Sequence, residues 1–136
     1  MKKAILFLMT TLILSSCGGS DDNLQSGIIG KWNKIKETKE YSNGSIEEVN
    51  LSTCELKETL ELKSNRQAML TKYSGTNCED ARISEGAYSY NESNNELTLP
   101  GNNKQIVEVN GNDMNFKFTV TGIQSYIKTV YFKRIN

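Results

Sequence analysis

The chain has few side chains suited to chemistry: three cysteines, at positions 17, 54 and 78, and no histidine. Histidine is the most frequent general base and transition-metal ligand in proteins. Its absence argues against most hydrolytic triads and most zinc or copper sites. We therefore expect no catalytic residues, no metal and no cofactor, and interpret the chain as a non-enzyme. A pair of carboxylates brought together by a sheet stays open as a catalytic alternative.

Length and charge narrow the class of protein further. The 136 residues suit one domain. Lysine and arginine number 16, and aspartate and glutamate also number 16. This balance gives no basic surface of the kind that binds nucleic acid, so we expect no nucleic-acid partner. The oligomeric state is left open.

The N-terminus has the layout of an export signal. Lys2 and Lys3 precede an apolar run over residues 4–14, and two small serines follow. A charged start, a short apolar core and small residues are typical of a secretory signal peptide. The core is shorter than the roughly 20 residues that cross a bilayer. We assign residues 1–16 to the signal.

The next residue changes the role of that signal. Residues 14–17, Leu-Ser-Ser-Cys, resemble the bacterial lipobox. The resemblance implies cleavage before Cys17 and attachment of acyl chains such as palmitate to it, which anchors the protein in the outer membrane. Residues 17–26 then form a flexible tether. The Ser-Asp-Asp at 20–22 resembles acidic export signals of surface lipoproteins and favours exposure on the cell surface; a plain solvated linker is the alternative.

Removing Cys17 from the count leaves two cysteines in an oxidising compartment. Residues 58–62 and 68–73 alternate as strands around a turn at 64–66, which predicts a hairpin. The outer ends of a hairpin lie together, so we expect a disulfide between Cys54 and Cys78. In the chain-entropy model such a bridge stabilises by roughly 3 kcal/mol. A redox pair is the alternative, although its typical CxxC spacing is missing.

The remainder of the chain consists of short alternating runs separated by turn residues, which is typical of an antiparallel meander. Eight strands are expected, or nine if residues 46–51 pair. Closing such a meander into a barrel removes its edges. The predicted strands are 31–41, 58–62, 68–73, 84–91, 96–99, 104–109, 113–121 and 125–134, with 46–51 as the ninth.

The start of the first strand carries a motif. Gly30 and Trp32, together with the features above, resemble the G-x-W motif of the lipocalins, and more closely the small lipocalin-like domains of bacterial lipoproteins. The resemblance implies that residues 27–136 form an all-β, up-and-down antiparallel barrel. It also implies that Trp32 packs at the closed end against a basic residue of the last strand. Arg134 is the best match by position and Lys133 the second.

A binding function follows from this interpretation. Met114, Phe116 and Phe118 alternate along one strand and, with Tyr88 and Tyr90, are candidates to line a ligand site; a packed core is the alternative for each. Residues 39–54 match the loop that often covers the open end, or form a solvated hairpin. We expect a membrane-anchored carrier of a small hydrophobic ligand at the cell envelope. The alternative is a non-catalytic interaction module whose filled barrel presents loops to a protein or glycan.

Overall fold

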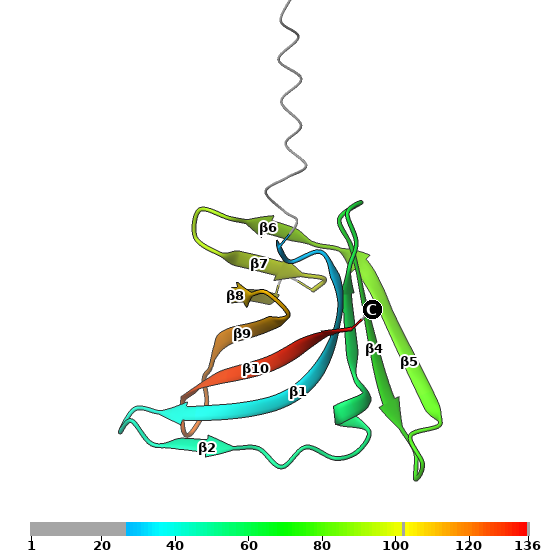
Figure 1. The fold of residues 1–136 in the computed structure, drawn as a ribbon. Coiled ribbons are helices and arrows are strands. Elements are labelled where there is room, and N and C mark those ends of the chain that lie inside the picture. Colours follow the sequence, from blue (N-terminus) through cyan, green and yellow to red (C-terminus); the bar gives the residue numbers. More distant parts are fainter. Residues whose placement is uncertain (1–26, 102, 136) are drawn as a thin grey trace, which may run out of the picture.

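The computed structural model describes residues 27–101 and 103–135 (Figure 1). The predictions made for the signal, the tether and Cys17 lie outside the described residues. Within them the regular secondary structure is almost entirely β, as the sequence predicted. The elements are β1 (Gly30–Tyr41), β2 (Ile46–Glu48), η3 (a 3-10 helix, Glu55–Lys57), β3 (Thr59–Leu62), β4 (Gln67–Ser74), β5 (Asp80–Ala87), β6 (Ser89–Asn91), β7 (Glu96–Leu99), β8 (Asn103–Asn110), β9 (Asp113–Val120) and β10 (Tyr126–Ile135).

The strands form one antiparallel sheet that curls into a nearly closed barrel. Their order is β5-β4-β3-β1-β10-β9-β8-β7-β6, with β2 added to β1. The two ends of this order belong to one stretch of chain, because Tyr88 alone separates β5 from β6. β5 pairs with β4 and β6 pairs with β7, so this stretch joins both ends of the sheet. If β5 and β6 are counted as one strand, the barrel wall has the eight strands that the sequence predicted, and β2 is the ninth.

A close backbone approach seals the wall near Tyr88. Gly86 pairs with Ala68 on β4, and a Cβ on Gly86 would lie 2.8 Å from the side chain of Pro100. Pro100 lies in the turn between β7 and β8. Only glycine lets the turn come this near. β5 is at one end of the sheet order and has only β4 as a neighbour. On its other side, this contact and not strand pairing closes the barrel.

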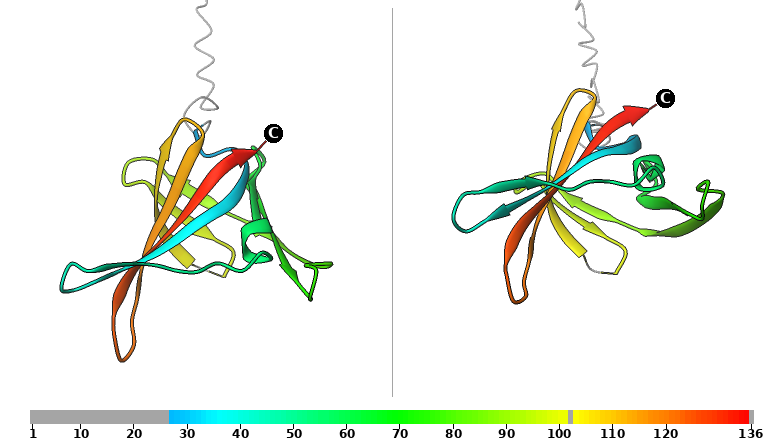
Figure 2. Two further views of the ribbon diagram at one scale, coloured as in Figure 1. Left: turned by 60° about the horizontal axis from the view of Figure 1, so that its bottom comes forward. Right: turned by 90° about the horizontal axis from the view of Figure 1, so that it is seen from below.

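Two differently built ends result from this arrangement. Figure 2 shows the β1–β2, β4–β5 and β9–β10 hairpins pointing apart at one end, which we call the mouth. The opposite, closed end holds the apolar core. Inward side chains of neighbouring strands meet there in register, such as Trp32 with Leu60 and Phe116 with Val130. The buried core comprises Ile28, Trp32, Leu60, Leu62, Ala68, Tyr88, Leu97, Val107, Met114, Phe116, Val130 and Phe132.

Candidate functional site

Trp32 anchors the closed end. Its side chain is fully buried, and its indole Nε1 donates a hydrogen bond to the carbonyl oxygen of Ile28 at 2.9 Å. The guanidinium carbon of Arg134 lies 4.1 Å from the centre of the indole ring. Arg134 also donates to the carbonyl oxygens of Ile29 at 2.6 Å and Gly27 at 2.8 Å. The last strand thus holds the chain entering the first strand in place.

Gly30 makes this contact possible. Its φ is +141°, and a Cβ at this position would overlap the guanidinium of Arg134. A residue with a side chain would therefore be strained and would also displace the arginine. Lys133, the second match from the sequence, turns outward and forms an ion pair with Asp113 at 2.8 Å. Arg134 is thus the basic residue that contacts Trp32.

A disulfide braces one side of the mouth. Cys54 and Cys78 are bonded, with their Cα atoms 5.1 Å apart. The bond ties the segment that leads into η3 to the turn between β4 and β5. Next to it, the carboxylate of Glu55 accepts hydrogen bonds from the backbone N–H and the hydroxyl of Ser52, both at 2.8 Å. These bonds lower the pKa of Glu55 below its ordinary value of 4.5.

The aromatic candidates divide into two groups. Met114, Phe116 and Tyr88 are 1%, 3% and 4% exposed and belong to the core. Phe118 and Tyr90 pack against that core but keep part of their surface free. The five side chains therefore do not form one lining.

Both tyrosine hydroxyls already have protein partners. Tyr88 donates to the carbonyl oxygen of Lys63 at 2.9 Å, and Tyr90 donates to the side-chain oxygen of Asn95 at 3.2 Å. Burial raises the pKa of both phenols, because it penalises the charged form. Neutral, hydrogen-bonded phenols at these positions stabilise the β6 side of the wall.

Sequence reasoning missed a chain of buried and half-buried charges between the core and the mouth. Lys34 and Glu37 are 8% and 5% exposed. The ammonium of Lys34 lies 3.3 Å from Glu37 and 3.5 Å from Glu58, and Lys128 lies 2.6 Å from the other carboxylate oxygen of Glu37. The order Glu58–Lys34–Glu37–Lys128 alternates in sign and runs from the β3 side of the barrel to β10. We call it the ion chain.

The ion chain gives the mouth a polar floor. Charged groups are costly to bury, and each one here is balanced by a neighbour of opposite sign. Lys128 continues the chain toward an aromatic residue, since its ammonium lies 6.0 Å from the centre of the Phe118 ring. Two of these residues lie on β1, one lies on β10 and one just before β3. Only the fold joins them, so no sequence motif could have revealed them.

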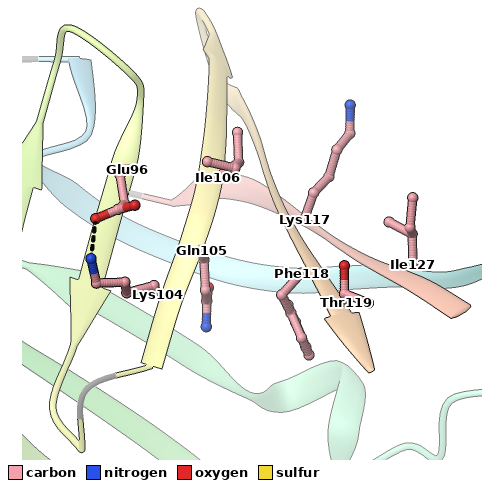
Figure 3. Close-up of a pocket in the computed structure, with 8 residues that line it drawn as sticks. All are labelled: Glu96, Lys104, Gln105, Ile106, Lys117, Phe118, Thr119 and Ile127. Atoms are coloured by element: carbon pink, nitrogen blue, oxygen red, sulfur yellow. Dashed lines mark hydrogen bonds and ion pairs between the residues drawn. The ribbon is translucent and has the colours of Figure 1, made fainter. Parts of the chain in front are cut away.

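The wall has a notch between β8 and β9. Pairing between these strands begins at Ile106 with Lys117, although β8 starts at Asn103 and β9 continues to Val120. A cavity of about 440 Å³ occupies the place where the strands diverge. Its lining consists of Glu96, Lys104, Gln105, Ile106, Lys117, Phe118, Thr119 and Ile127 (Figure 3).

Side chains from both faces of the wall line the notch. Gln105 and Phe118 extend to one side of the two strands, whereas Ile106, Lys117 and Ile127 extend to the other (Figure 3). Phe118 belongs to the inward row of β9, so the first side faces the barrel interior. The side-chain oxygen of Gln105 is buried and, among the described residues, has no hydrogen-bond partner. The notch thus offers apolar surface and one free acceptor.

Two further observations limit other kinds of site in the described part of the chain. Residues 27–101 and 103–135 hold no group of three His, Cys, Asp or Glu side chains placed to share a metal ion. A helix long and apolar enough to cross a bilayer is likewise missing from these residues.

Comparison with known proteins supports the fold. No curated protein matches the chain. The family model of the lipocalin-like domain matches residues 28–116, which covers more than half of the chain and runs from the residue that accepts the Trp32 hydrogen bond to the middle of β9. The chain therefore belongs to the lipocalin-like domain family.

Proposed function

We propose that this protein is a lipid-anchored carrier that holds a small, largely hydrophobic ligand at the bacterial cell envelope. The observation that carries the proposal is the notch, a cavity of about 440 Å³ with Phe118, Ile106 and Ile127 in its lining. Ligand sites are typically concave and mostly apolar, with few polar groups that fix orientation. Gln105 supplies such a group. The lipocalin-like family is generally non-enzymatic, which supports binding without catalysis.

The anchor rests on the sequence of residues 1–17. We propose acylation of Cys17 and attachment to the outer membrane, with the barrel on the cell surface. Labelled palmitate should enter the wild-type protein and not a Cys17→Ala variant. Protease added to intact cells should then degrade the barrel; resistance would place the barrel on the periplasmic side.

Filling the notch with a large side chain tests whether the ligand binds there. Thr119→Trp would place a large side chain in the cavity, and Leu56→Trp adds the same side chain to an exposed position on η3, which does not line the cavity. Native mass spectrometry after incubation with a hydrophobic cell extract should find ligand on the wild type and on Leu56→Trp, and much less on Thr119→Trp. An empty wild-type barrel after this incubation would contradict the proposal.

Exposed apolar residues at the hairpin tips favour the second candidate function, an interaction module that presents its loops to a protein or glycan. Ile123 and Ile46 lie at the tips of the β9–β10 and β1–β2 hairpins and are strongly exposed. Exposed apolar residues on a loop end can mark a contact with a protein or glycan. Cross-linking on intact cells should lose a partner in an Ile123→Asp/Ile46→Asp variant if this second function holds, while ligand binding at the notch would be unaffected.

A further inference from the structure

The β4–β5 wall of the mouth carries two cations directly opposite each other. Lys72 on β4 pairs in register with Arg82 on β5. Ala68 and Leu70 point from β4 to the core, so the two-residue alternation of a strand places Lys72 on the same inner face. Arg82, as its cross-strand partner, shares that face. Like charges in such a pair repel and weaken the sheet.

Among residues 27–101 and 103–135, no acidic side chain forms an ion pair that relieves this repulsion. Every ion pair found among the described residues involves other cations, so no carboxylate lies within 4 Å of Lys72 or Arg82 there. Glu58 lines the same cavity as the two cations, but its ion pair is with Lys34. Asp80, two residues before Arg82, pairs in register with Ser74 and forms no ion pair with the arginine.

A cavity lies directly against these residues. Its volume is about 320 Å³, and its lining consists of Glu58, Lys72, Tyr73, Ser74 and Arg82. The charge of Glu58 is balanced by Lys34, so the cavity is left with an excess of positive charge. Ser74 adds a hydroxyl that can donate a hydrogen bond. Both cations are exposed, which leaves their N–H groups accessible from the mouth.

From this arrangement we infer that Lys72 and Arg82 form an oxyanion site, which takes the carboxylate, sulfate or phosphate group of the ligand. A guanidinium binds an oxyanion through two parallel N–H donors, and an ammonium beside it adds a second positive charge. An oxyanion between the two cations also removes their repulsion. The inference extends the proposed function, since it assigns a negative charge to a ligand whose apolar part the proposed function describes.

The test compares matched probes on the purified full chain in a non-ionic detergent. Dansyl-undecanoic acid and its methyl ester share the apolar part and differ in the carboxylate, and sodium sulfate supplies the anion alone. Lys72→Gln/Arg82→Gln removes the proposed site. Lys31→Gln/Lys63→Gln removes the same charge away from the cavity and serves as control. Circular dichroism checks that each variant is folded.

We expect the acid to bind the wild type and the control at least about tenfold more tightly than it binds Lys72→Gln/Arg82→Gln, because charge-assisted hydrogen bonds are lost. The ester should bind all three proteins equally. Sulfate, compared with chloride at equal ionic strength, should raise the melting temperature of wild type and control more than that of the double variant. It should also shift the backbone amide signals of Lys72 and Arg82.

The other possible results separate a failure of the oxyanion site from a failure of the proposed hydrophobic ligand. Equal affinity of the acid for all three proteins overturns the oxyanion site, whether or not the ester binds. Binding of the ester without any preference for the acid overturns it as well, yet leaves the proposed carrier of a hydrophobic ligand intact. A sulfate effect confined to wild type and control, with no binding of either acyl probe, supports the oxyanion site and contradicts the hydrophobic ligand.

Discussion

The closed end of the barrel is apolar and filled, whereas the mouth is charged and partly open. At the closed end, Trp32 is fully buried and its one polar atom is hydrogen-bonded. At the mouth, the notch and the Lys72–Arg82 pair leave polar or charged groups facing open space, and the ion chain lies between them and the core. The difference separates the filled core that stabilises the sheet from the half where we propose that the ligand binds.

The first prediction breaks the closed end. Trp32→Ala removes the largest core side chain and its contact with Arg134, and should lower the free energy of unfolding by about 3–5 kcal/mol. Urea unfolding followed by circular dichroism measures this, because Trp32 is the only tryptophan and its fluorescence is lost with it. A loss below about 1 kcal/mol would mean that the closed end does not hold the barrel together.

The second prediction removes one charge from the ion chain, which lies between the closed end and the mouth. Glu37→Leu leaves Lys34 with only Glu58 as a carboxylate partner among the described residues and takes the partner of Lys128 away, and breaking a buried ion pair by removing one member typically costs about 3–5 kcal/mol. Lys34→Met/Glu37→Leu removes one buried charge of each sign and should recover most of that loss. Urea unfolding of both variants tests the pair; a double variant as unstable as the single one would show that packing, and not charge, sets the effect.

The third prediction loosens the mouth. Cys54→Ser/Cys78→Ser should lower the free energy of unfolding by roughly 3 kcal/mol in the chain-entropy model for a separation of 24 residues. Urea unfolding of the wild type with and without reductant gives an independent value. Hydrogen exchange should quicken near η3 and the β4–β5 turn before it does so around Trp32. Uniform acceleration would contradict a separate role for the mouth.

The smallest expected effect is a dependence of the stability of the mouth on pH, through Glu55. The pKa of Glu55 is lowered in the folded state by its bonds from Ser52, so the stabilisation is fully present above the unfolded pKa and is lost as pH falls through the folded pKa. Ser52→Ala keeps the bond from the backbone N–H and removes the one from the hydroxyl, so wild type should exceed this variant in urea midpoint at pH 6, and the difference should narrow as the pH drops below 4.5. A difference that stays constant over this range would contradict the assignment.

Local pattern was enough to predict most of the strands. Alternation along residues 113–120 and the turn signals on either side depend on neighbours in sequence, which is why β9 and its hairpin were foreseen. The predicted strand 84–91 was too short and unbroken; the structure starts it at Asp80 and interrupts it at Tyr88. That break follows from closure of the barrel, because β5 and β6 pair with opposite ends of the sheet.

The candidate site was less predictable. Strict alternation from Trp32 would put Glu37 on the outer face of β1, but the pairing of β1 with β10 shifts register between Lys34 and Lys36. This bulge turns Glu37 inward, opposite Val130, where it meets Lys34 and Lys128. A single inserted residue in a strand leaves no signal in composition or spacing, so the ion chain could not be inferred from residues alone.

The sequence by itself determined the all-β class, the number of wall strands, the hairpin that brings Cys54 to Cys78 and the position of Trp32, because each depends on short-range alternation, turn chemistry or a local motif. Only the tertiary structure decided which strands meet, where the wall opens between β8 and β9, and which charges are buried together. Those features depend on pairing between segments far apart in the chain, and small shifts of register and curvature control them.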